Sequence, residues 1–157
     1  MQKRIVAPPQ PERASPDQDW LHLEGLAELE ITSEDAAHPI EDALTPGGTS
    51  GWRAAGPGTQ TIWVLFARPQ PLRRVWLNFR ETHIERTQEY VLRWSPDGGQ
   101  SFRDIVRQQW NFSPHGATSQ TQDHHVSLPA VTVLELTITP DTSGGPALAC
   151  LAQLRLA

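Results

Sequence analysis

From Trp20 onward the sequence varies with a period of two, and this period constrains the fold more than any other feature. In the run 27–31, Ala27, Leu29 and Ile31 alternate with two glutamates. Because successive side chains of a strand point to opposite faces, such a run has one buried face and one solvated face. Helical periodicity is nearly absent. The pattern predicts an all-β fold, an antiparallel sandwich or barrel.

About eight segments have the composition of strands. Segment 61–66 is apolar on both faces, which is typical of a central strand. The turn 96–99 contains two glycines, which supply the positive φ of a tight hairpin. Segment 39–44 is the one plausible helix, with proline at an early position. The predicted strands are 27–31, 61–66, 74–80, 88–94, 102–106, 123–128, 131–138 and 148–156.

The charge balance excludes two classes of partner. The chain has 13 Lys and Arg residues against 18 Asp and Glu residues, a net charge of −5 and a pI near 5.6. Such a chain lacks the overall basic character of proteins that bind phosphate backbones or anionic lipids. No apolar run approaches the roughly 20 residues of a membrane-spanning helix. We therefore expect neither nucleic acid nor a membrane as a partner.

The length of 157 residues suits one domain. Residues 1–19 are rich in Pro, Gln and charge, so we expect a flexible Pro-rich N-terminal tail there and one β-sandwich domain over 20–157. The N-terminus lacks the apolar core of a signal peptide, which favours a cytoplasmic location. The single cysteine, Cys150, excludes an internal disulfide, and its apolar neighbours indicate a small buried residue rather than a reactive thiol.

The sequence carries no recognisable catalytic or metal-binding motif. His124 and His125 are adjacent, so on a strand they point to opposite faces and cannot readily bind one metal ion. There is no Gly-x-Ser-x-Gly and no His-Glu-x-x-His, and the glycines of 56–58 are not followed by the Lys-Ser/Thr of a phosphate-binding loop. We expect a non-enzymatic protein that needs no cofactor.

Three segments contain residue types suited to sugars, whose C–H faces stack on aromatic rings and whose hydroxyls pair with planar or charged groups. Segment 45–59 has five glycines and two prolines, which predict neither helix nor strand. Segments 80–87 and 109–116 are the other two predicted loops. The candidate ligand-binding residues are Trp52, Arg53, Arg80, His83, Arg86, Trp110 and Asn111.

These candidates also have structural interpretations that the sequence leaves open. Trp52 can pack beneath its loop, and Trp110 can close the rim of the sandwich. Arg80 and Arg86 can form, with Glu81, a solvated ion network that adds little to stability.

The order of these features resembles the discoidin domains, the C-type domains of coagulation factors five and eight, within the galactose-binding-like superfamily. The resemblance lies in ITSE (31–34), IEDAL (40–44) and GWRAA (51–55), in TIWVLF (61–66) and LRRVWL (72–77), and in EYVL (89–92) and SPDGG (95–99). It covers about 24–157. It implies a discoidin-like jelly-roll β-sandwich of about eight antiparallel strands, with at most one short helix. In bacterial members the loops at one end most often bind carbohydrate, and the position of 80–87 often contributes His or Arg contacts.

Two departures from the family pattern concern metal and disulfide. Members of the family commonly hold a structural calcium ion near an Asp-Gly element, through carboxylate and carbonyl oxygens. Here Thr45 stands where the expected Asp would be, so we do not expect calcium. Extracellular members often close the sandwich with a disulfide, which a single cysteine cannot form.

The residues and the resemblance together predict a non-enzymatic carbohydrate-binding module whose partner is a carbohydrate or another small polar ligand. The alternative is an intracellular protein-interaction scaffold that uses the same sandwich to dock a protein partner.

Overall fold

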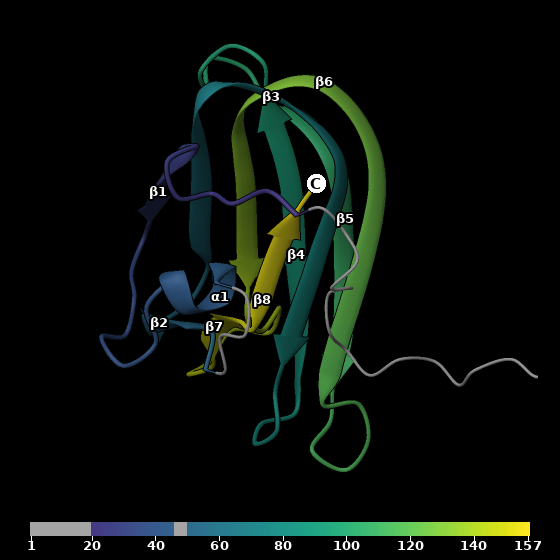
Figure 1. Cartoon of the computed structure of the whole chain (residues 1–157). Coiled ribbons are helices and arrows are strands. Elements are labelled where there is room, and N and C mark those ends of the chain that lie inside the picture. Colours follow the sequence, from purple (N-terminus) through teal and green to yellow (C-terminus); the bar gives the residue numbers. More distant parts are fainter. Residues whose placement is uncertain (1–19, 46–49) are drawn as a thin grey trace, which may run out of the picture.

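The structure, a computed structural model, describes residues 20–45 and 50–157 (Figure 1). Within these residues the prediction of an all-β chain is confirmed, and the predicted helix is a single turn. The elements in chain order are β1 (Ala27–Ile31), α1 (Glu41–Leu44), β2 (Trp52–Pro57), β3 (Gln60–Arg80), β4 (Arg86–Ser95), β5 (Arg103–Phe112), β6 (Ser119–Thr139), β7 (Leu148–Leu151) and β8 (Gln153–Leu156). The tail expected over 1–19 lies outside the described residues. In the described part of the chain no helix has the length and apolar character needed to cross a membrane.

Two strands of 21 residues, β3 and β6, join two layers of sheet. The first half of β3 pairs with the second half of β6, and this layer has the order β1-β3-β6-β4-β5. The second half of β3 pairs with the first half of β6 and with β8, which makes a three-stranded layer. Figure 1 shows both long strands arching over one end of the molecule. All of these pairings are antiparallel.

The bends in β3 and β6 explain why strand boundaries were wrong. Four predicted strands merge in pairs, 61–66 with 74–80 and 123–128 with 131–138. The pairing register of β3 and β6 shifts three times between Leu65 and Arg74, a stretch that contains Pro69 and Pro71. Proline donates no hydrogen bond to a ladder, so these two prolines predicted the end of a strand. The strand instead continues through them with a bend.

The core lies between the two layers. Tyr90 and Leu92 of the five-stranded layer are fully buried, as are Leu77 and Phe79 of the three-stranded layer. The rings of Phe79 and Tyr90 stack with their centroids 5.2 Å apart. Each large apolar side chain buried in this way stabilises the fold by about 1.5–3 kcal/mol. The period of two in the sequence is therefore the alternation between core and solvent.

Segment 45–59, predicted to be neither helix nor strand, contains β2, so that prediction was wrong for its second half. Trp52 and Ala54 are buried while Arg53 between them is exposed, which is the alternation of a strand. β2 pairs with β7 and sets Arg53 opposite Cys150. The density of glycine and proline concealed this short pattern. Residues 46–49 of the segment lie outside the described residues.

Candidate ligand-binding site

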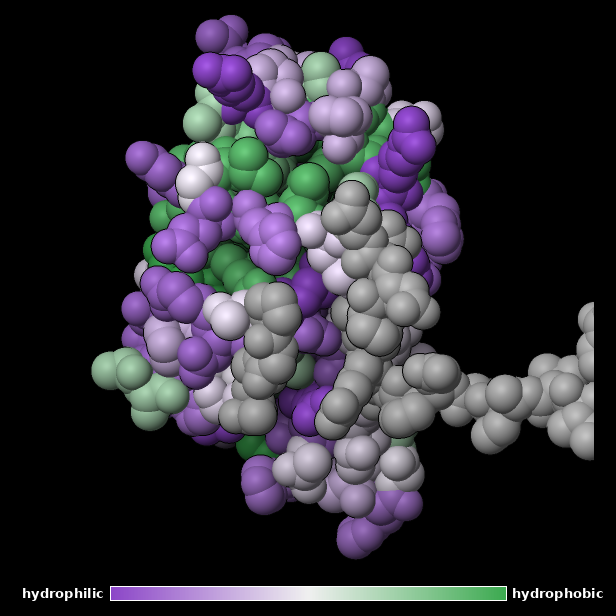
Figure 2. Space-filling model, viewed as in Figure 1, coloured by the Kyte–Doolittle hydropathy of each residue, from purple (hydrophilic) through white to green (hydrophobic). Residues whose placement is uncertain are grey.

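The connections at the end of the sandwich opposite the bends form its loop end (Figure 1). The loops 81–85, 113–118 and 140–147 meet there, beside the β2–β7 pair. Figure 2 shows mainly hydrophilic and intermediate residues at this end, while apolar patches lie higher on the same face. Polar loops held by a rigid scaffold are where binding sites usually occur.

The predicted loops are shorter than expected, because the flanking strands reach into them. Arg80 is the last residue of β3 and Arg86 the first of β4. Trp110 and Asn111 belong to β5, which extends from Arg103 to Phe112 rather than ending at 106 as predicted. These side chains are therefore fixed by ladder pairing rather than carried on loops.

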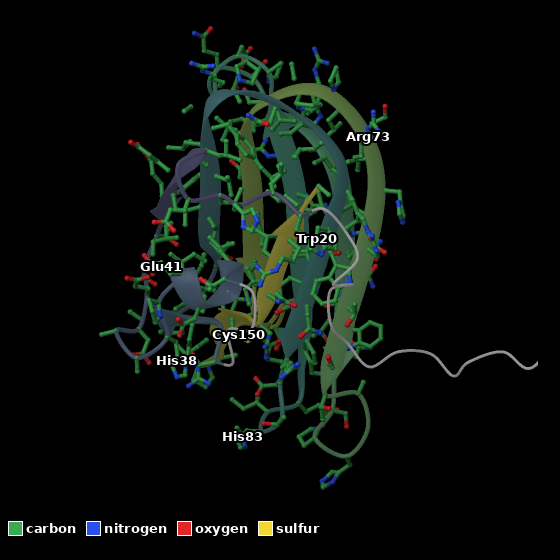
Figure 3. All side chains as sticks on the ribbon, viewed as in Figure 1. Trp20, His38, Glu41, Arg73, His83 and Cys150 are labelled. Atoms are coloured by element: carbon green, nitrogen blue, oxygen red, sulfur yellow. The ribbon has the colours of Figure 1, made fainter. Side chains whose placement is uncertain are left out.

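A cavity of about 160 Å³ brings four of the seven predicted residues together, and we name it the Arg53–Arg80 pocket. Besides Arg53 and Arg80, its lining includes Trp52 and His83. Figure 3 places His83 at the outer tip of this end, with Cys150 closer to the body of the domain. Side chains from β2, β3 and the loop after it thus face one space.

The backbone on both sides of the Arg53–Arg80 pocket is held by hydrogen bonds. The Arg53 amide donates to the His38 carbonyl over 3.2 Å, and the Arg53 carbonyl accepts from the amide of Asp35 over 2.8 Å. Cys150, opposite Arg53 in the ladder, donates its thiol proton to the Arg80 carbonyl over 3.3 Å. The backbone at both arginines is therefore held in place, while both side chains are exposed.

Trp52 contributes to this pocket as a packed residue. Its side chain is only 1% exposed, and its indole Nε1 donates to the Ser33 carbonyl over 3.1 Å. A ring enclosed to this degree leaves no open face for a sugar to stack on. Of the two interpretations that the sequence left open, the geometry favours packing.

Arg86 does not line the Arg53–Arg80 pocket but is enclosed behind Glu81, which does. Its side chain has no exposed surface, and its Nε donates to a carboxylate oxygen of Glu81 over 2.8 Å. One terminal nitrogen donates to the Pro140 carbonyl over 2.6 Å, and the guanidinium lies 4.8 Å from the centroid of the Phe112 ring. The interpretation of this pair as a solvated ion network is therefore wrong, because the pair is largely buried.

The ionisation of the wall residues follows from this arrangement. Burial alone would raise the pKa of Glu81, but hydrogen bonds from Arg86 and from the His83 amide bring the pKa below its usual value, so Glu81 is ionised. Burial raises the pKa of the Cys150 thiol despite the neighbouring cations, so the thiol is neutral at pH 7. No pattern in the sequence indicated that Glu81 and Cys150 would meet here, since their proximity depends on how the segment of β7 lies beside the end of β3.

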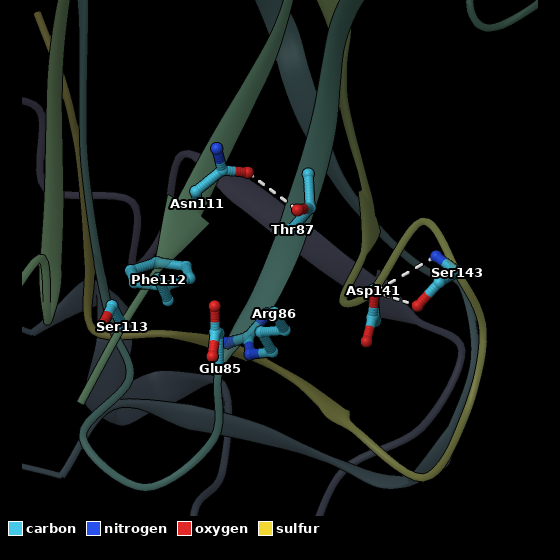
Figure 4. A pocket seen from close by; sticks show the side chains of 8 residues that line it. All are labelled: Glu85, Arg86, Thr87, Asn111, Phe112, Ser113, Asp141 and Ser143. Atoms are coloured by element: carbon cyan, nitrogen blue, oxygen red, sulfur yellow. Dashed lines mark hydrogen bonds between the residues drawn. The ribbon is translucent and has the colours of Figure 1, made fainter. Parts of the chain in front are cut away.

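Two further hollows take the remaining candidates, so the seven residues do not share one patch. The Glu85–Asp141 hollow, of about 400 Å³, includes Arg86 and Asn111 in its lining (Figure 4). Thr87 donates its hydroxyl proton to the side-chain oxygen of Asn111 over 2.7 Å. The side-chain nitrogen of Asn111 points away from this bond. Trp110 and Asn111 border the second hollow, of about 390 Å³.

The resembling family commonly binds calcium near the position of α1. Among residues 20–45 and 50–157, no group of three or more His, Cys, Asp or Glu side chains could hold a metal ion. The Leu44 carbonyl, at the end of α1, accepts a hydrogen bond from the Arg155 guanidinium.

Comparison with known proteins identifies the fold. No family model matches the sequence, and no curated protein does so significantly. Among solved structures, a family 32 carbohydrate-binding module from C. perfringens NanJ, in complex with galactose, superposes with a TM-score of 0.60 and 14% identity, over 83% of this chain and 92% of that one.

Two other solved structures are similar to the same degree. A chitosan-binding module of a chitosanase/glucanase from Paenibacillus sp. IK-5 gives a TM-score of 0.62 and 18% identity, over 83% of this chain and 94% of that one. The family 32 module of AlyQ, in complex with 4,5-unsaturated mannuronic acid, gives a TM-score of 0.61 and 13% identity, over 84% of this chain and 95% of that one. The chain therefore has the discoidin-type, galactose-binding-like β-sandwich fold of the family 32 carbohydrate-binding modules.

Proposed function

We propose that this protein is a non-enzymatic carbohydrate-binding module and that the Arg53–Arg80 pocket is its site. The observation that carries the proposal is the convergence of Arg53, Arg80 and His83 on one cavity at the loop end of a rigid sandwich. Solved structures with the same fold hold sugars, among them galactose. The guanidinium groups offer paired donors to adjacent hydroxyls, and His83 adds a further polar contact.

A binding role, rather than a catalytic one, suits the charges around this pocket. Hydrolysis of a glycosidic bond uses two carboxyl groups in different protonation states. The carboxyl group that lines the pocket belongs to Glu81, and Arg86 and the His83 amide occupy its oxygens. A small open cavity also predicts weak affinity, because little area is buried.

A glycan array probed with the folded protein, followed by calorimetry on the best ligand, tests this proposal. We expect binding that Arg80→Ala weakens about tenfold or more, because charge-assisted hydrogen bonds are lost. Arg68→Ala, an exposed arginine in the bend at the other end of the sandwich, is the matched control and should bind normally. A folded protein that binds no glycan would contradict the proposal.

The alternative is a protein partner docked on the same loops, and Ile84 is the observation that favours it. Ile84 is a large apolar side chain that is 44% exposed in loop 81–85. A purified partner whose binding depends on Ile84 and is unaffected by sugars would support docking over carbohydrate binding.

A further inference from the structure

Arg53 and Arg80 present guanidinium groups to the same cavity, and no carboxylate of residues 20–45 or 50–157 is paired with either of them. We propose that the Arg53–Arg80 pocket selects an acidic sugar, a hexuronate whose carboxylate is held by these two arginines. The proposal rests on the proposed function and specifies its ligand class.

The contacts of Arg80 leave its binding face free. Its Nε donates to the Asn78 side-chain oxygen over 3.2 Å, which orients the guanidinium. Asn78 is itself buried and donates through Nδ2 to the hydroxyls of Ser119 and Thr121, each over 3.0 Å. In the described part of the chain, the two terminal nitrogens of Arg80 have no hydrogen-bond partner. An anchored Nε with free terminal nitrogens presents the guanidinium edge to a ligand.

Arg53 is likewise held through its backbone while its side chain stays exposed. Its guanidinium takes part in no hydrogen bond or ion pair with residues 20–45 or 50–157. Four other arginines of the sandwich are paired with carboxylates: Arg74 with Asp123, Arg86 with Glu81, Arg93 with Glu135 and Arg107 with Glu89. What sets Arg53 and Arg80 apart from these four is that they lack such partners and line one cavity.

The charge balance around the pocket is positive although the chain carries −5. Glu81 is the carboxylate of the lining, and Arg86 behind it offsets its charge at 2.8 Å. Asp42 is not part of the lining, and its carboxylate accepts a hydrogen bond from the Ser50 hydroxyl over 2.6 Å. The positive charges of Arg53 and Arg80 are therefore not offset by a carboxylate within the lining.

A carboxylate complements this arrangement better than a hydroxyl does. The guanidinium fork matches the two carboxylate oxygens, and hydrogen bonds between charged partners are about twice as strong as neutral ones. A neutral sugar would desolvate both cations without compensating their charge. The Glu85–Asp141 hollow is lined by two carboxylates and by Arg86, whose charge is already paired with Glu81, so we expect an acidic group to favour the Arg53–Arg80 pocket.

Calorimetry with matched sugar pairs tests this ligand class. The methyl glycosides of galacturonate and galactose, glucuronate and glucose, and mannuronate and mannose differ only at C6. In at least one pair we expect the acidic member to bind about tenfold more tightly or better. Added salt should weaken the binding of the acidic member and leave that of the neutral member nearly unchanged.

Four variants, at three arginines, assign the preference to its residues. Arg53→Gln and Arg80→Gln should each reduce the preference for the acidic sugar, and Arg68→Gln should leave it intact. Arg80→Lys keeps the charge but loses the fork, so it should retain only part of the preference. The three arginine side chains are exposed, and circular dichroism checks the folding of the four variants.

The outcomes separate the two proposals. Sugar binding with equal or tighter affinity for every neutral member overturns the acidic-ligand inference and leaves the carbohydrate-binding function standing. A preference that Arg68→Gln reduces as much as the pocket variants do would also overturn it, because the effect would then be general electrostatics. Failure of the folded protein to bind any sugar contradicts the proposed function itself.

Discussion

At the scale of the residue, Arg86 shows a difference between the sequence-based prediction and the structure. The chain places Arg86 three residues after His83, in a polar stretch typical of a binding loop. The fold instead encloses its guanidinium against Glu81, the Pro140 carbonyl and the Phe112 ring. A buried cation of this kind stabilises the wall of the site, not the ligand.

Arg86→Met should therefore lower the free energy of unfolding by about 3–5 kcal/mol, because the variant leaves the largely buried carboxylate of Glu81 without its cation. Urea denaturation with linear extrapolation measures the change. Arg107→Met removes a cation whose side chain is 68% exposed in its pair with Glu89, and it should change stability little. If Arg86→Met abolished sugar binding but kept wild-type stability, Arg86 would be a ligand contact after all.

The sequence could supply residue types but not their surroundings. Arg53 and Arg80 were predicted as candidates, and they line one pocket. The same reasoning selected Trp110 and Asn111, which border other hollows. Whether a polar residue near a turn is exposed, paired or enclosed depends on contacts with segments more than 50 residues away, such as the one from Arg86 to Pro140. Local pattern carries no information about such contacts.

At the scale of the element, the β2–β7 pair forms one side of the site; β7 lies within the predicted strand 148–156, but β2 was missed. The two strands are short, and the apolar alternation of β2 is confined to Trp52 and Ala54 within a Gly- and Pro-rich stretch. The alternation in β3, β4 and β6 was recognised because it extends over more residues. The strand order and the bends followed from pairing between distant segments, which the sequence pattern does not encode.

Gly51 is the residue that lets β2 approach β7 closely. It has φ +66°, and a Cβ there would lie 2.6 Å from the Leu151 carbonyl oxygen and 2.8 Å from the Ala152 Cα. Gly51→Ala should lower the free energy of unfolding by about 2–5 kcal/mol, because of left-handed backbone strain and the forced separation of the two strands. It should also weaken sugar binding, since Leu151 and Ala152 line the pocket.

Gly58→Ala is the matched control, because Gly58 also has a positive φ, of +96°, but open space where the Cβ would be. Gly58→Ala should lower the free energy of unfolding by only about 1–2 kcal/mol, from backbone strain, and should leave binding unchanged. Urea denaturation and calorimetry measure both variants. Equal losses in the two would show that the close approach of β2 to β7 does not matter.

At the scale of the whole molecule, β3 and β6 belong to both layers, so the layers fold as one unit. A polar contact also crosses between them. The Tyr90 hydroxyl of β4 lies 2.7 Å from Nε2 of His124, which stands in the three-stranded half of β6. His124 is half-buried, and its neighbour His125 is exposed on the opposite face, as their adjacency on a strand predicts. With neutral His124, the hydroxyl can donate to the imidazole.

This contact makes stability depend on pH in a defined direction. Burial lowers the pKa of His124 in the folded protein, only partly opposed by the charge of Asp123, so the unfolded chain binds the proton more readily. Protonation therefore favours unfolding. The contribution of His124 is complete above the ordinary histidine pKa of about 6.5 and is lost as the pH falls from there toward the lower folded value. Hydrogen bonds from Ser101 and Ser95 hold the pKa of Asp97 at about 2, so that carboxyl titrates well below this window.

His124→Gln should flatten this pH dependence, because the glutamine carbonyl can accept from Tyr90 but does not titrate near neutral pH. Urea denaturation at a series of pH values from 7.5 to about 5 measures the slope for each variant. His125→Gln, at the exposed neighbouring position, should keep the wild-type slope. A steep acid loss that persists in His124→Gln would place the titrating group elsewhere. Because the contact joins the two layers, the loss should appear as one cooperative transition at each pH, with tryptophan fluorescence and circular dichroism coinciding.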